Sequence, residues 1–159
     1  MAEQSQLLEL NLRRWILSKD ENGHAVWREM VEPMRVPASQ TVICDMWDNH
    51  WSRGATERVD AMAPRMNTVV TAARERGVRI IHAPSDTLDA YADTPARQRA
   101  LDAPTVTPPA DMPHDDPPLP IDDSDHGSDT GEPEPYKAWS RQHPAIEIEQ
   151  ARDAVTADG

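Results

Sequence analysis

The side chains best suited to catalysis or ligand binding lie together in the stretch from Thr41 to Trp51, which reads TVICDMWDNHW. A carboxylate, Asp45, directly follows a short apolar run, and two indoles and an imidazole come next, from Trp47, His50 and Trp51. A carboxylate can accept and return a proton, and aromatic rings can line an apolar pocket for a small molecule. An Asp at this point can equally cap the next turn or helix, so both roles are open for Asp45.

Two short strands are expected to position these side chains. The apolar run Thr41–Cys44 is typical of a strand buried on both faces, which would make Cys44 a buried thiol. Val78–His82 predicts a second strand, parallel to the first across a right-handed connection. Because ligands bind at the carboxyl ends of parallel strands, His82 is expected at the same edge as Asp45.

One helix, Glu57 to Arg76, is predicted between the two strands. It has Thr56 as its N-cap and Gly77 just past its end. Pro64 predicts either a kink or a regular helix that starts near Ala63. Apolar residues recur at helical spacing and are expected to pack in the core: Val59, Met62, Met66, Val69, Val70 and Ala73.

The order strand, Asp45-Met46, helix, Gly77, strand resembles the opening of the isochorismatase-like cysteine hydrolases, the superfamily of nicotinamidases and N-carbamoyl amidohydrolases. The resemblance implies an α/β fold, a three-layer α/β/α sandwich with a parallel sheet. It also implies hydrolysis of an amide or related bond in a small molecule by a cysteine nucleophile, without a cofactor. Asp45 matches the family's catalytic Asp, and Trp47, His50 and His82 are expected to line the substrate pocket.

Two parts of the family's catalytic machinery have no clear counterpart. The family's nucleophilic Cys begins a helix after a fourth strand, whereas the only cysteine here, Cys44, is next to Asp45 and should point to the opposite face. The family's Lys ends a third strand, whereas Lys137 precedes the predicted third strand, His143–Ile148. We therefore expect the N-terminal part of a longer, apparently truncated hydrolase. The alternative is a catalytically dead family member that serves as a binding or oligomerisation module.

The segments after the second strand predict further elements but no metal site. Asp86–Leu101 predicts a polar helix interrupted at Pro95, and Ala151–Gly159 predicts the approach to another helix. Metal-dependent members of the family carry an Asp-x-His pattern after the second strand. That spacing is absent after His82, so no metal is expected.

The chain is predicted to have two parts. Residues 1–37 form an N-terminal β-hairpin extension, with strands in Leu7–Val31 joined by a turn at Asn22-Gly23. Residues 38–159 form the partial hydrolase domain. Within it, residues 103–135 hold nine prolines and nine acidic residues but no Lys or Arg, which predicts a mobile acidic insertion.

Composition limits the partners. The net charge of -12 argues against nucleic acid or an anionic membrane surface as a partner. A single cysteine excludes an internal disulfide, and no leader or membrane-length segment is seen, so a cytoplasmic protein is expected. An unfinished parallel sheet would leave an open edge, which predicts a homo-oligomer. A third class, an acidic interaction protein that works through residues 103–135, would leave the pocket-like residues 45–51 without a role.

Overall fold

The computed structural model describes residues 7–107, 109–110, 128–133 and 135–157. The chain divides into two compact units. One contains the residues up to Ala38 together with the described residues of Val106–Asp122. The other contains Ser39–Thr105 with the described residues from 128 onward. Much of the predicted acidic insertion, residues 108, 111–127 and 134, lies outside the described residues.

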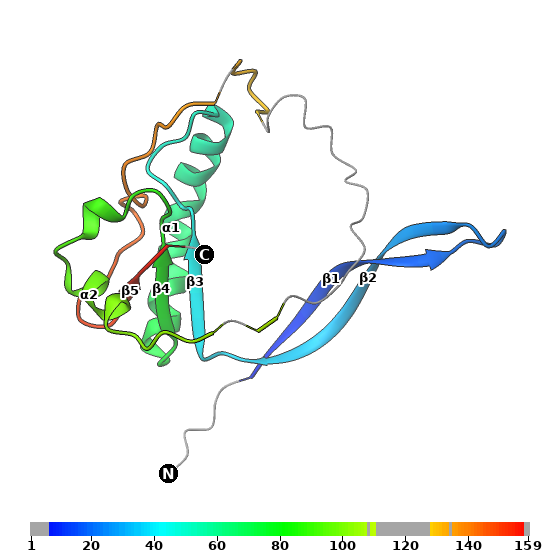
Figure 1. Ribbon diagram of the computed structural model, residues 1–159, viewed down its shortest axis with the longest axis horizontal. Helices are drawn as coiled ribbons and strands as arrows, with labels where there is room; N and C mark the ends of the chain where they lie inside the picture. The colour runs from blue at the N-terminus through cyan, green and yellow to red at the C-terminus, as the bar shows by residue number, and fades with distance from the viewer. Residues whose placement is uncertain (1–6, 108, 111–127, 134, 158–159) are drawn as a thin grey trace, which may run out of the picture. The chain divides into compact units, whose positions relative to one another are not determined.

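The first unit is a long antiparallel hairpin, the β1–β2 ribbon (Figure 1). Its strands are β1 (Leu7–Lys19) and β2 (Ala25–Pro37). The turn is fixed by Asp20, whose carbonyl accepts the N–H of Gly23 and whose Oδ1 accepts two further backbone N–H groups. Gly23 has a φ of 83°, a conformation that glycine adopts without strain. The predicted hairpin is confirmed, and β2 continues six residues beyond the predicted end at Val31.

The second unit is built on a strand–helix–strand arrangement. Its elements are β3 (Gln40–Cys44), α1 (Arg53–Glu75) and β4 (Arg79–Ala83). β3 and β4 are parallel, and Ile43 lies opposite His82 in their register. A short strand, β5 (Ala154–Val155), pairs with the other side of β4, so the described residues form a parallel sheet in the order β3-β4-β5. The predicted mixed α/β class with a parallel sheet and a hairpin is therefore confirmed.

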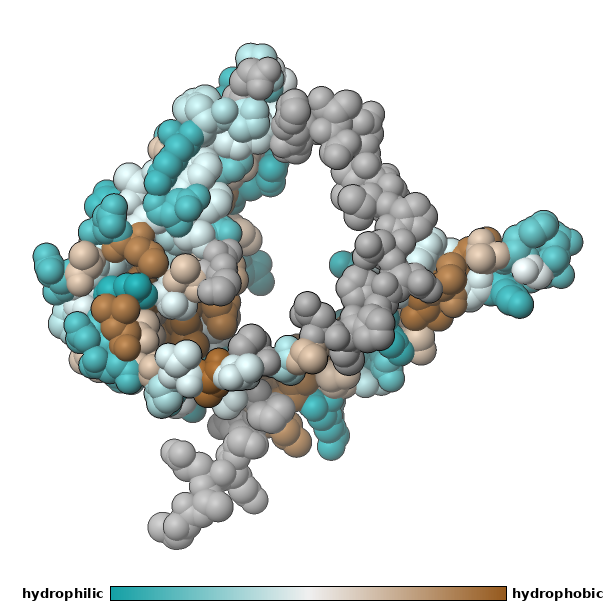
Figure 2. All heavy atoms as spheres, viewed as in Figure 1, coloured by the Kyte–Doolittle hydropathy of each residue, from teal (hydrophilic) through white to brown (hydrophobic). Residues whose placement is uncertain are grey.

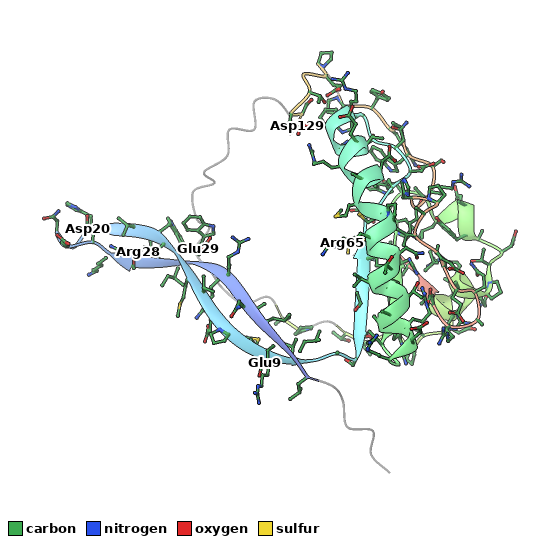
Figure 3. All side chains as sticks on the ribbon, turned by 180° about the vertical axis from the view of Figure 1, so that it is seen from behind. Glu9, Asp20, Arg28, Glu29, Arg65 and Asp129 are labelled. Atoms are coloured by element: carbon green, nitrogen blue, oxygen red, sulfur yellow. The ribbon has the colours of Figure 1, made fainter. Side chains whose placement is uncertain are left out.

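The hydrophobic core lies between one face of this sheet and α1, which runs along the sheet in Figures 1 and 3. Met62 and Val69, which the helical pattern assigned to the core, are instead 47% and 60% exposed. The apolar stripe of α1 is thus narrower than predicted. The buried residues of this core are Ile43, Met46, Ala63, Val70, Ile80 and Ile146.

The opposite face of β3 is open in the part of the chain that the structure describes. Val42 is 52% exposed and Cys44 is exposed, while Ile43 between them is buried against α1. The predictions of a strand buried on both faces and of a buried Cys44 thiol are therefore wrong. An apolar run in a strand does not reveal whether one or two layers cover the sheet, because that depends on distant segments.

Helix α1 starts one turn earlier than predicted, with Ser52 and not Thr56 at its N-cap. Thr56 instead accepts the N–H of His50 through its hydroxyl. Pro64 lies inside the helix on its exposed side, where water can solvate the carbonyl that Pro64 leaves without a donor. Gly77, with a φ of 82°, follows the helix as predicted.

The later elements are shorter than predicted. The segment 86–101 divides into a 3₁₀ turn, η1 (Leu88–Tyr91), and α2 (Pro95–Leu101), with the break at Pro95 as expected. The predicted strand at His143–Ile148 is wrong: this segment is irregular, and the strand lies at Ala154–Val155, where a helix was expected. Within the described residues, the segment does not form backbone hydrogen bonds with a neighbouring strand. Instead, the N–H of Ala145 donates to the ring of His143, and the N–H of Glu147 donates to the side chain of Asn67.

Candidate functional site

Asp45 lies at the carboxyl end of β3 in a left-handed backbone conformation, with a φ of 48°. Its N–H donates to the carbonyl of Ala83 (3.0 Å), which extends the pairing with β4 by one residue. Its Oδ1 accepts the N–H of Ser85 (3.1 Å) from the loop after β4. Positive φ values are uncommon outside glycine but are most tolerated by Asp and Asn, and they gather at functional sites. The carboxylate is therefore held at the edge where the two strands end.

Three nearly parallel rings lie beside this carboxylate. Trp139 stacks on Trp47 with ring centroids 4.5 Å apart and on His50 at 5.4 Å, and both interplanar angles are below 15°. Trp47 is fixed further by its Nε1–H, which donates to the carbonyl of Ser85 (3.0 Å). The Nε1–H of Trp139 is buried and has no acceptor among the described residues.

A small cavity of about 160 Å³ opens between the strand end and the start of α1. The structure thus brings together three of the four predicted site residues, Asp45, Trp47 and His50. A space of this size accommodates a group of several heavy atoms, such as a carboxamide. The residues that line the cavity are Asp45, Trp47, Asn49, His50, Ala55, Thr56 and Val59.

The fourth predicted residue, His82, is placed elsewhere. It is fully buried, and its ring nitrogens face Oε1 of Gln142 (2.8 Å) and Oδ2 of Asp153 (3.1 Å). The Nε2 of Gln142 donates to the carbonyl of Ile146, so its Oε1 must face the histidine. Both ring nitrogens of His82 therefore meet acceptors. The side chain points toward α1 because residues alternate between the two faces of β4, and it does not line the cavity.

Asp153 is the centre of this buried polar network. Arg74 on α1 binds it through Nε (2.9 Å) and Nη2 (2.6 Å), and the N–H of Glu149 donates to it at 2.8 Å. Burial alone would raise the pKa of Asp153, but the hydrogen bonds from Arg74, Glu149 and His82 outweigh it and hold the pKa below its ordinary value. The network joins α1, β4 and the segment before β5.

Asp48 attaches the segment that contains Trp139 to the strand end. Its carboxylate accepts the N–H and hydroxyl of Ser140 (2.8 and 2.7 Å) and the N–H of Arg141 (3.2 Å). Burial would raise the pKa of Asp48, but these bonds lower it. In the same segment the ammonium of Lys137 donates to the carbonyl of Asp86 (2.6 Å), one residue after the Ser85 that binds Asp45. Lys137, which does not match the family's position in sequence, thus contacts the loop that binds the carboxylate.

Sequence reasoning gave no role to Trp139 or to Lys137. Composition was the one indication that this segment is structured, because Tyr136–Trp139 contains a lysine and two aromatic residues after a long segment with neither. Nothing in that local pattern indicates which strand end the segment contacts.

A second long-range contact covers the N-terminus of α1. Thr130 Oγ1 accepts the N–H of Gly54 (3.1 Å), Glu132 Oε1 accepts the N–H of Arg53 (3.2 Å), and Asp129 forms an ion pair with Arg58. Figure 3 places Asp129 at this end of the helix. A carboxylate there is favourable because the first N–H groups of a helix have no partners within it.

Glu132 is predicted to protect the Arg53 amide at the start of α1 from hydrogen exchange. The hydroxyls of Ser128 and Thr130 donate to its carboxylate and lower its pKa to about 2. Because the folded pKa is depressed, the contact is complete above the ordinary value of 4.5 and is lost as the pH falls toward about 2. Glu132→Ala, which removes the acceptor, should speed exchange of the Arg53 N–H at neutral pH, measured by NMR.

Glu57→Ala is the matched control for this experiment. Glu57 lies in the same helical turn and is exposed, but it pairs with the Arg53 side chain and not with a backbone N–H. Equal exchange rates in both variants would contradict the role of Glu132.

Searches with protein-family models, among curated proteins and among solved structures found no match to this chain. In the described residues no helix is both long and apolar enough to cross a bilayer. The same residues contain no cluster of three or more His, Cys, Asp or Glu side chains arranged to bind a metal.

Proposed function

We propose that this chain carries the aspartate-bearing part of an isochorismatase-like cysteine hydrolase, which acts on an amide or related bond of a small molecule. The observation that supports the proposal best is the position of Asp45: at a strand end, in a left-handed conformation, facing a small cavity lined by aromatic rings. The proposal extends the fold to a three-layer α/β/α sandwich, in which further helices would cover the open face of the sheet.

In the proposed reaction Asp45 accepts the proton of a cysteine thiol, and the thiolate attacks the carbonyl carbon of the substrate. Collapse of the tetrahedral intermediate breaks the C–N bond, and Asp45 returns the proton to the leaving amine. Water then attacks the thioester, giving one proton to Asp45. The carboxylic acid leaves, and that proton returns to the thiolate. The ammonium of Lys137, which donates to the carbonyl of Asp86 next to Ser85, would favour the thiolate over the thiol.

Cys44 does not supply this nucleophile. It is exposed on β3 and does not line the cavity, so the proposed thiol must come from a residue outside residues 1–159. The same observation favours a second function, in which a catalytically inert family member binds a small amide at the same cavity. Reading the gene downstream of the Gly159 codon separates the two. A further strand followed by a Cys at a helix start supports the hydrolase, and a stop codon supports the binding module.

Ligand binding at Asp45 is predicted for both functions, and the tryptophans of the stack provide the signal. Titration with nicotinamide or N-carbamoylglycine should change the tryptophan fluorescence saturably. Asp45→Asn should weaken this binding by about tenfold or more, because the ligand loses a hydrogen bond to a charged acceptor. Asn keeps the acceptor for Ser85 and tolerates the positive φ.

Asp86→Asn provides the matched control for the titration. Asp86 also has a positive φ, 58°, and lies in the neighbouring loop, but it does not line the cavity. It should bind like the unmodified chain. If the two variants bind alike, or if neither probe saturates, the cavity is not the site.

A further inference from the structure

The β1–β2 ribbon leaves an apolar face and a strand edge without cover among the described residues. Leu8, Leu10 and Leu12 on β1 are 48%, 39% and 39% exposed, and Met34, opposite Leu10, is 45% exposed. Figure 2 shows hydrophobic residues along this ribbon. A two-stranded hairpin is marginally stable alone in water, and a third strand or a packed face is usually needed.

The two edges of the ribbon differ. β2 contains Pro33 and Pro37, which lack an N–H and so interrupt the row of donors on its outer edge. β1 has neither proline nor glycine from Leu7 to Lys19. Natural proteins usually protect edge strands against pairing, and β2 is protected in this way while β1 is not. The free edge of β1 is therefore the one able to accept another strand.

The turn and Pro33 show which residues of β1 direct their backbone N–H and C=O groups away from β2. Asp20 N–H donates to the carbonyl of His24 on the other side of the ribbon, and backbone groups alternate between the two sides along a strand. Odd-numbered residues of β1 therefore direct their N–H and C=O groups to the free edge. The pairing of Asn11 with Pro33 agrees, because a proline fits opposite a residue whose backbone groups face outward.

We propose that two copies of this chain pair through β1 as antiparallel strands, with Asn11 of one copy opposite Asn11 of the other. In this register the outward-facing groups of the odd-numbered residues bond to each other. Residues of even number also face each other, so the apolar faces of both ribbons lie on one side of a four-stranded sheet. The occupant of the β1 edge is thus a second copy of the chain.

Charge complementarity selects this register. With Asn11 on the two-fold axis, Glu9 lies opposite Arg13 of the second copy at two symmetric positions, and Leu10 lies opposite Leu12. An axis at Glu9 or at Arg13 would place like charges opposite each other. Within one ribbon Glu9 already pairs with Arg35 and Arg13 with Glu29, on exposed side chains. In the dimer these four residues form a row of alternating charge.

Charge reversal tests the pairing. Sedimentation velocity on the full chain should show a dimer at micromolar concentrations. E9R alone and R13E alone each place two like-charged pairs across the interface and should raise the dimer dissociation constant by about tenfold. An equimolar mixture of the E9R and R13E chains restores two opposite-charge pairs and should form a heterodimer at least as tight as the unmodified dimer. A monomeric unmodified chain, or a mixture no tighter than its components, would overturn the proposal.

Proline substitution tests the edge itself. Asn11→Pro removes the outward N–H at the axis and should abolish the dimer. Val31→Pro makes the same change on the outer edge of β2, which already contains Pro33, and should leave the dimer intact. If both variants lose the dimer equally, the effect comes from disruption of the hairpin itself. If the dimer survives Asn11→Pro, the interface lies elsewhere. Either result refutes pairing through the β1 edge.

Discussion

Asp153→Asn should lower the free energy of unfolding by about 3–5 kcal/mol, the usual cost of removing one partner from a buried ion pair. Asp153 is fully buried, Arg74 is 5% exposed and His82 is 0% exposed. The neutral amide keeps the shape of the side chain but leaves the Arg74 guanidinium without its buried counter-charge. Urea denaturation followed by circular dichroism measures the loss. Asp93→Asn, at an exposed position, is the control, and a difference of less than about 1 kcal/mol between the two variants would contradict the network's role.

The same carboxylate predicts how stability depends on pH. Its folded pKa lies below the ordinary value of 3.8, so its contribution is present above that value and is lost as the pH falls through the folded pKa. Between neutral pH and this acid range the unmodified chain should therefore lose more stability than Asp153→Asn does. Parallel losses in the two proteins would assign the acid sensitivity to other groups.

Ile80→Ala should cost about 2–5 kcal/mol of stability, as for other large-to-small changes in a packed core. Ile80 is 1% exposed in the cluster between the sheet and α1. Its neighbour Ile81 points to the other face of β4, where it lines an open cavity of about 640 Å³ together with Arg79 and Arg99.

Ile81→Ala is therefore the matched control for Ile80→Ala, with the same chemical change one residue away. It should cost clearly less, because Ile81 is only partly buried. Equal costs, measured by urea denaturation, would mean that a second layer covers this face of the sheet, as in a three-layer sandwich.

Local patterns in the sequence were sufficient for the elements nearest to one another. The alternation along β1, the Asn22-Gly23 turn, the helical spacing in α1 and Gly77 each act within a few residues, so the hairpin and the β3–α1–β4 arrangement were predictable. The grouping of Asp45, Trp47 and His50 followed from the same local order.

Long-range contacts were not predictable from these patterns. The alternation in His143–Ile148 suggests a strand, but the N–H groups of Ala145 and Glu147 donate to the side chains of His143 and Asn67, and that of Ile146 donates to the carbonyl of His143. His82 looked like a pocket residue because nothing near it in sequence reveals the carboxylate of Asp153, 71 residues later. The exposure of Cys44 likewise depends on which distant segments cover β3.

The position of Asp153 also has a kinetic consequence. β3, α1 and β4 are contiguous between Gln40 and Ala83, whereas Arg74 and its acceptor Asp153 are 79 residues apart. Closing so long a loop costs more chain entropy than forming β3–α1–β4, and it is therefore slower. Arg74 and His82 should thus stay hydrated until the C-terminal segment packs against them. Contacts made after the rate-limiting barrier mainly slow unfolding and scarcely speed folding. The buried ions would then act chiefly on the lifetime of the folded protein.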